Sequence, residues 1–198
     1  MELTAEARDP LGDAKRNSFT RQDVEAIARR RGWLPPNTLT NHSDLPRESI
    51  DMQSTLAHWM AEAAQLLGAR AEELPALEHL LECVFYYEPA ALLARVENQA
   101  VLARQGARDV VRVLAALVLE APAIDSNRFK EIVSALKEAT GRRGPELFHP
   151  VRLALAGCAG EGEYDRVILL LDSAAQLPWA VPVKGCRQRI LEFCAALV

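Results

Sequence analysis

The sequence predicts an all-α protein, built as a multi-helix bundle of two packed helical clusters. Hydrophobic residues make up 49% of the 198 residues, enough for a sizeable core, and they recur at the spacing of helical faces along most of the chain. Aromatic residues are only 6%, whereas strands favour aromatic and β-branched side chains. Glycine or proline stands at the boundaries of the periodic segments, where helices end or begin.

Residues 1–45 are expected to form an N-terminal helix followed by a Pro-rich linker. The helix is predicted between residues 18 and 31, with Ser18 or Thr20 as its N-cap. Its apolar face consists of Val24, Ile27 and Ala28. The stretch LPPNTLTNHSDLP that follows contains three prolines and cannot continue a helix.

Residues 46–140 are predicted to form a helical bundle of short antiparallel helices joined by short loops. The apolar residues in this region follow the i, i+3, i+4 rule. The expected helices are residues 50–67, 75–87, 89–103, 107–120 and 125–140. Prolines 75 and 89 suit the first positions of two of these helices, because proline lacks an amide hydrogen that would be unpaired there anyway.

Residues 141–198 are expected to form a connector and a C-terminal helical cluster. The connector reads GRRGPELFHPVRLALAG. Gly141 can take the positive φ that ends the preceding helix, and Gly144 with Pro145 can make a turn. Pro150 is then expected at the first position of a short helix that ends at Gly157.

The connector and its flanks resemble a known family. The run RFKEIVSALKEATGRRGPELFHPVRLALAG, followed by EGEYDRVILLLD, is similar to the C-terminal anticodon-binding region of bacterial glutamyl-tRNA synthetases, which contains the element G-x-K-G-x-x-L-F-x-P-L-R-x-A-L-T-G. The matching positions are Phe129, Gly141, Gly144, Leu147, Phe148, Pro150, Arg152, Ala154, Leu155 and Gly157. A looser similarity extends from Leu77 to Val198 and leaves out residues 1–45.

The resemblance implies a noncatalytic tRNA-binding module. Synthetases of this family activate glutamate on a Rossmann domain with a His-x-Gly-His-like element and a Lys-Met-Ser-Lys-Ser-like loop. The sequence contains neither element, and it has no strand, Gly-rich loop and helix unit that could hold a phosphate. The chain is therefore predicted not to be an enzyme, with no catalytic residues and no cofactor.

Basic residues in the last third are the candidates for RNA contact. The whole chain has a net charge of −4, which opposes nonspecific binding to phosphates, but residues 126–198 carry more basic than acidic side chains. The predicted nucleic-acid-binding residues are Arg142, Arg143, Arg152, Lys184 and Arg187, with Arg189 adding charge nearby. The three arginines at positions 29–31 end the first helix, where they complement the negative end of its dipole.

A helical protein-interaction module that keeps the scaffold without RNA binding is the alternative. It is favoured by the acidic net charge and by the low aromatic content, because single-stranded RNA recognition uses stacking rings. The family's threonine before the last glycine is Ala156 here, and Glu161 and Glu163 follow that glycine. Exposed rings beside the basic residues would favour RNA, and buried rings would favour the alternative; the rings in question are Trp33, Trp59 and Trp179.

No metal site or membrane segment is predicted. The four cysteines show no CxxC spacing and are expected to be free thiols, and the histidines are scattered without an HExxH motif; the cysteines are Cys83, Cys158, Cys186 and Cys194. The sequence has no signal-peptide pattern and no run of 18 apolar residues. The expected location is the cytoplasm, and the expected partner is tRNA or a protein.

Overall fold

The computed structural model describes residues 19–35, 47–158 and 164–197, and within these ranges it contains ten α-helices and no strand. The all-α, multi-helix prediction is therefore confirmed. The helices are α1 (Arg21–Arg30), α2 (Arg47–Gly68), α3 (Leu74–Phe85), α4 (Pro89–Leu93), α5 (Val96–Leu102), α6 (Ala107–Leu119), α7 (Ser126–Thr140), α8 (Pro145–Ala156), α9 (Tyr164–Ala174) and α10 (Cys186–Ala196).

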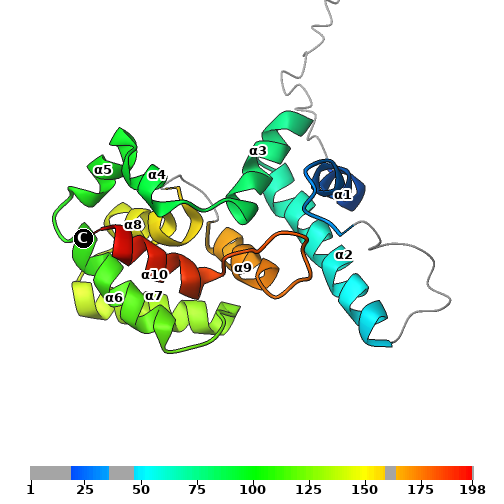
Figure 1. Ribbon diagram of the computed structural model, residues 1–198. Coiled ribbons are helices and arrows are strands. Elements are labelled where there is room, and N and C mark those ends of the chain that lie inside the picture. Colours follow the sequence, from blue (N-terminus) through cyan, green and yellow to red (C-terminus); the bar gives the residue numbers. More distant parts are fainter. Residues whose placement is uncertain (1–18, 36–46, 159–163, 198) are drawn as a thin grey trace, which may run out of the picture.

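The helices form two groups that share one hydrophobic core (Figure 1). Helices α1, α2 and α3 make the smaller group, and α9 lies between the groups, packed against α2 and α8. In the larger group, α6 packs against α7, α8 and α10. The expected division into residues 1–45, 46–140 and 141–198 remains a proposal. Helix α6 packs closely against α8 and α10, which follow residue 140, so the helices before and after that residue are in contact.

The expected N-terminal helix is α1, which packs against α2 and α3. Thr20 caps it in a capping box with Asp23, which satisfies two backbone amides at once. The residues after α1 continue the attachment, because the ring of Trp33 stacks on that of Phe85 with centroids 3.9 Å apart. Most of the predicted linker, residues 36–46, lies outside the described residues.

The single helix expected over residues 89–103 is wrong, because the structure divides it into α4 and α5. The side-chain amide of Asn98 donates to the carbonyl of Leu92 at 2.9 Å, and that of Gln99 donates to Leu93 at 3.2 Å. These bonds add to the backbone bonds at the C-terminal end of α4, where the Leu92 carbonyl also accepts from the Arg95 amide at 3.3 Å. Two amide side chains from α5 thus cap α4 and stabilise the break.

The position of Pro150 is also corrected. Helix α8 begins one turn earlier than expected, with Gly144 as N-cap and Pro145 in its first turn, and Pro150 lies inside it. Proline at the start of a helix costs nothing, because the amide hydrogen that it lacks has no partner there. Pro150 does remove one internal hydrogen bond, but it is buried in the core, where packing can offset the loss.

A buried arginine joins the two groups of helices. Arg189 of α10 is 0% exposed, and its guanidinium nitrogens donate to four backbone carbonyls. The acceptors are Lys184 at 2.7 Å, Leu155 at 3.1 Å, Cys83 at 2.9 Å and Val84 at 2.8 Å. Cys83 and Val84 lie in the last turn of α3 and Leu155 lies in the last turn of α8, so the cation binds the negative ends of two helix dipoles.

The four cysteines are free thiols, as predicted. Burial raises the pKa of Cys83 to about 12, and burial with the nearby Asp172 raises the pKa of Cys186 well above its usual range.

Thiol reagents such as iodoacetamide react with the thiolate form of cysteine, which a raised pKa makes scarce. We therefore expect Cys83 and Cys186 to stay unmodified by iodoacetamide at pH 8 in the native protein and to react after unfolding, as mass spectrometry of both states would reveal. Rapid native labelling of Cys186 would contradict its burial.

Candidate nucleic-acid interface

The predicted contact residues do not gather on one face. Arg142 lies against Gly106, the N-cap of α6. Arg187 donates a hydrogen bond to the carbonyl of Leu119, the last residue of the same helix. A helix of this length is roughly 20 Å long. The two arginines therefore mark opposite ends of α6, and a surface that joins them would have to run along the whole helix.

Two of the C-terminal basic residues take part in holding the fold. Lys184 is half-buried, and its ammonium donates to the carbonyl of Tyr87 at 3.0 Å and pairs with Glu192 at 2.7 Å. Arg189, which was expected to add surface charge, is fully buried and lies over the ring of Tyr87 at 4.7 Å. Burial lowers the pKa of Arg189. The expectation for Arg189 is wrong, since no RNA can reach a buried guanidinium.

The connector presents the other predicted residues around the first turns of α8. The Arg142 guanidinium pairs with Glu146 at 3.1 Å, while Arg143 is exposed. Arg152, two turns into α8, is half-buried and lies over the ring of Phe148 at 5.4 Å. The positive φ of Gly141, 65°, ends α7 and turns the chain toward this position.

Sequence reasoning missed a basic residue in the loop between α5 and α6 and another in the first turn of α6. Arg104 lies 3.1 Å from Nδ1 of His149 on α8, and Arg108 stands two residues after Gly106, against which Arg142 packs. We call these five residues the basic corner: Arg104, Arg108, Arg142, Arg143 and His149. Arg108 and Arg112 are spaced by four within α6, which is the helical signal that could have revealed Arg108. Arg104 precedes this helix, so the same signal does not apply to it.

Positive charge is in excess at the basic corner. Among the residues that the structure describes, Glu146 pairs with Arg142 of the corner, and Asp109 pairs with Arg112, one turn after Arg108, at 2.9 Å. Arginines therefore outnumber these carboxylates, in contrast to the net charge of −4 of the whole chain. The corner also holds the N-terminal ends of α6 and α8, whose dipoles favour anions.

The tryptophans belong to the core rather than to this corner. Trp33 is 1% exposed and Trp59 is 3% exposed. Trp179 is half-buried, donates to the carbonyl of Ala174 at 2.9 Å and meets Trp59 edge to face. These rings fill the space between α2, α3 and the loop after α9, so they offer no stacking surface beside the basic residues.

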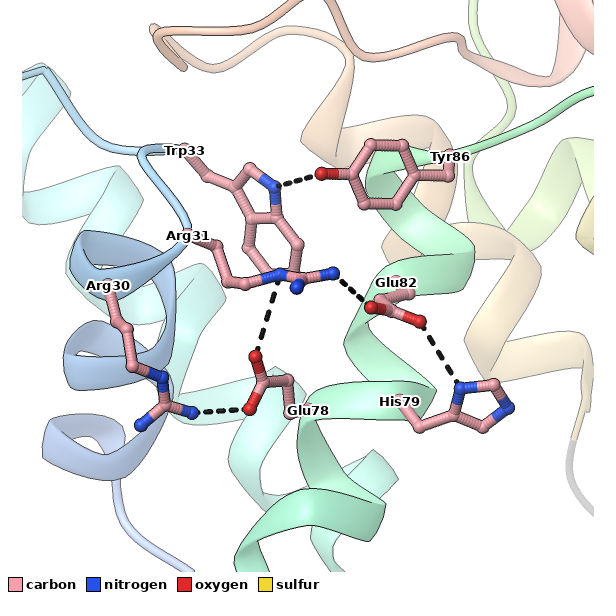
Figure 2. A network of polar contacts seen from close by, with 7 residues as sticks. All are labelled: Arg30, Arg31, Trp33, Glu78, His79, Glu82 and Tyr86. Atoms are coloured by element: carbon pink, nitrogen blue, oxygen red, sulfur yellow. Dashed lines mark hydrogen bonds and ion pairs between the residues drawn. The ribbon is translucent and has the colours of Figure 1, made fainter.

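The arginines at the end of α1 bind α3, as Figure 2 shows. Arg30 pairs with Glu78, and Arg31 pairs with both Glu78 and Glu82. The guanidinium of Arg31 also lies 5.6 Å from the ring centre of Trp33, whose indole nitrogen donates to the Tyr86 hydroxyl at 3.3 Å. Besides complementing the dipole of α1, these arginines connect it to α3. Carboxylates neutralise them, so they are poor candidates for phosphate contact.

Metal sites and membrane-spanning helices are not found among the described residues. Within these ranges, no group of three or more histidine, cysteine, aspartate or glutamate side chains is placed to hold a metal ion. None of the described helices is long and apolar enough to cross a membrane.

Comparisons with known proteins agree with the resemblance seen in the connector. A family model described as "Anticodon binding domain" matches residues 36–170. The curated protein "Glutamate--tRNA ligase 2" of Syntrophus aciditrophicus (strain SB) is 36% identical over 84 residues, which are 42% of this chain and 15% of that protein. No solved structure matches the chain significantly. Because the family model covers well over half of the sequence and includes the connector, the chain belongs to the anticodon-binding-domain family.

Proposed function

We propose that this chain is a noncatalytic tRNA-binding module that contacts RNA through the basic corner. The observation that carries the proposal is the family match over residues 36–170, a range that holds all five residues of the corner. The name of the relative, a glutamate–tRNA ligase, supports tRNA as the nucleic acid. A cytoplasmic location is part of the same proposal, because a tRNA-binding module has to meet tRNA.

The corner has the features that phosphate binding requires. Arginine contacts phosphate oxygens through two parallel N–H groups, and it stays charged at any physiological pH. Arg143, Arg104 and Arg108 are exposed, whereas Arg142 holds a carboxylate at 3.1 Å that a phosphate could replace. The RNA backbone would thus pass over the connector and the start of α6. Among the predicted residues, Arg142 and Arg143 are the central contacts, and Arg152 lies two turns into α8, over the ring of Phe148.

The remaining predicted contacts, Lys184 and Arg187, have a smaller part in the proposal. Lys184 already donates to a backbone carbonyl and a carboxylate, so it would have to give up both to meet a phosphate. Arg187 is exposed but lies at the far end of α6. An RNA long enough to follow α6 would reach it, and a short one would not.

Two observations support the noncatalytic part of the proposal. The matching family model describes a binding domain, and the sequence contains neither of the two elements with which glutamyl-tRNA synthetases handle ATP. Purified protein is therefore expected to show no ATP–pyrophosphate exchange with glutamate.

Burial of the tryptophans favours a second candidate, a helical module that binds a protein. RNA-binding surfaces for single strands commonly use exposed rings, and Trp33 and Trp59 are almost fully buried. The acidic net charge also favours this candidate. Under this alternative, the family scaffold remains and the basic corner has no RNA ligand.

Salt dependence of tRNA binding tests the proposal. Fluorescently labelled tRNA titrated with the protein should bind at low salt, and the logarithm of the affinity should fall linearly with the logarithm of the salt concentration. The slope should be roughly −0.7 to −0.9 for each phosphate neutralised, and three or four arginine contacts would give a slope of about −3. Heparin serves as the control polyanion. If unlabelled tRNA displaces the labelled tRNA at a much lower concentration of negative charge than heparin does, the protein recognises RNA and not charge alone. No binding at low salt would contradict the proposal and leave the protein-interaction module.

A further inference from the structure

We propose that a cavity between the two groups of helices binds a small organic amine with an apolar body. The cavity has a volume of about 360 Å³ and lies between α2, α9 and the segment that leads into α7. Figure 1 shows α9 between α2 and the larger group of helices. Cavities that bind small ligands typically measure about 300–1,000 Å³ and often lie between the helices of bundles. None of the residues that line this cavity belongs to the basic corner, so the inference does not depend on tRNA binding.

Aliphatic side chains from three segments supply an apolar lining. Leu66 comes from α2, Ile124 from the segment before α7, and Leu169 and Leu170 from α9. Ile124 and Leu170 are buried, and the two other leucines are half-buried. Moving a ring or an alkyl chain from water onto such a surface is favourable, so we expect the ligand to have an apolar body.

Acidic side chains outnumber basic ones around this lining, which favours a cation. Three carboxylates and one guanidinium lie among the described lining residues; they belong to Glu62, Asp125, Asp172 and Arg166. Within the described part of the chain, Glu62 forms no ion pair. A charge that leaves water needs a partner of opposite sign. The ammonium of a bound amine can therefore pair with Glu62, while the hydroxyl oxygens of the lining serines accept its other hydrogens.

The buried carboxylate of Asp172 holds the cavity in shape. Asp172 is 5% exposed, and its two oxygens accept from the backbone amides of Ile124 and Cys186, each at 2.7 Å. These bonds attach the segment before α7 and the start of α10 to α9. A site that is already formed spends less of its binding free energy on ordering. Asp172 thus positions the wall of the cavity and leaves Glu62 to meet the ligand.

Two probes of opposite charge test the preference for a cation. Tryptamine and indole-3-propionate both carry an indole ring, but the first has an ammonium and the second a carboxylate. Tryptamine should produce saturable shifts of the backbone amide NMR signals of Ile124 and Ser173 in the full chain. Indole-3-propionate should bind at least tenfold more weakly, because it meets carboxylates instead of pairing with one.

A conservative variant tests the carboxylate that pairs with the amine. Glu62→Gln removes the charge and keeps the shape of the side chain, and it should weaken tryptamine binding about tenfold through loss of a charge-assisted hydrogen bond. Glu138→Gln is the matched control, because it makes the same change in net charge at an exposed position of α7 outside the lining. The control should bind tryptamine like the wild type.

A second pair of variants tests the space itself. Ala123 is exposed and lines the cavity, whereas Ala139 is exposed on α7 outside the lining. Ala123→Trp should abolish the tryptamine-dependent shift of Ser173, and Ala139→Trp should leave it unchanged. If Ala123→Trp does not fold, the comparison of Glu62→Gln with Glu138→Gln still decides.

The outcomes are independent of the tRNA titration. No saturable shift with tryptamine, phenethylamine or hexylamine would refute the site. Equal binding of tryptamine and indole-3-propionate, or equal binding of tryptamine by the folded Glu62→Gln and Glu138→Gln variants, would refute selection of a cation by Glu62. Neither result bears on whether the wild type binds tRNA, and absence of tRNA binding would leave the amine site intact.

Discussion

Replacing Arg189 with Met is expected to lower the free energy of unfolding by roughly 3–5 kcal/mol, as for the loss of one partner of a buried polar network. The side chain is 0% exposed, and its donors satisfy carbonyls in the last turns of α3 and α8 and at Lys184. Methionine fills a similar volume but donates nothing. Each buried carbonyl left without a partner costs about 1–3 kcal/mol, and repacking recovers part of the sum.

Urea unfolding followed by circular dichroism measures this loss, and Arg187→Met is the matched control. Arg187 also donates to a helix C-terminal carbonyl, that of Leu119, but it is exposed, so water can replace the bond. The control should change the unfolding free energy by less than about 1 kcal/mol, which is usual for a surface position. A loss below about 1 kcal/mol for Arg189→Met would contradict its role in joining the helices.

The contrast between these two arginines shows what charge composition alone leaves undecided. Arg187 and Arg189 both lie near the start of α10. A count of charges alone predicts that either of them could contact RNA equally well. Their positions relative to the apolar residues do differ, because Arg189 has the spacing of a buried helical face together with Cys186, Ile190 and Phe193. Applying the helical period to residues 186–193 would have placed Arg189 in the core.

The long helices could be predicted from periodicity because their buried faces are regular. Helices α6 and α7 have bounds within a residue or two of the expected ones. The break between α4 and α5 could not be predicted in this way, since it depends on the side chains of Asn98 and Gln99 reaching back to carbonyls of α4. The start of α8 was misplaced because two prolines five positions apart could each occupy the first turn of a helix.

The candidate site could be predicted only in part, because some of its residues come together only through tertiary packing. Arg142 and Arg143 come from a stretch with a recognisable family pattern, so the sequence indicates them directly. Arg104 and Arg108 lie outside that stretch; Arg104 comes within 3.1 Å of His149 only in the folded chain, and Arg108 follows Gly106, against which Arg142 packs. Proximity of this kind depends on tertiary packing, which a single sequence does not specify.

Changing the two connector arginines should weaken tRNA binding at least tenfold at low salt. The variant Arg142→Gln with Arg143→Glu removes both cations, while the glutamine can still donate a hydrogen bond to Glu146, the partner of Arg142 at 3.1 Å. A hydrogen bond to a charged group contributes about 1.5–3 kcal/mol, and 1.4 kcal/mol is a factor of ten in affinity. The salt slope should fall by one to two units, about one for each phosphate that the variant no longer neutralises.

The control for this variant must change charge equally at another place. Arg29 and Arg30 are unsuitable, because Arg29 pairs with Glu25 and Arg30 holds α1 to Glu78 of α3. Arg21→Gln with Lys130→Glu is better matched, since both residues are exposed and the change in net charge is the same. Lys130 lies in the first half of α7, well away from the connector at its other end.

Titration of labelled tRNA with the wild type and these two double variants, at low salt and with equal melting curves, is the most direct test of an RNA-binding basic corner. We predict that the control variant binds like the wild type within about threefold, a shift of under 1 kcal/mol, while the connector variant binds at least tenfold more weakly. Equal binding by all three folded proteins, or an equal decrease in both variants, would contradict RNA binding at the basic corner.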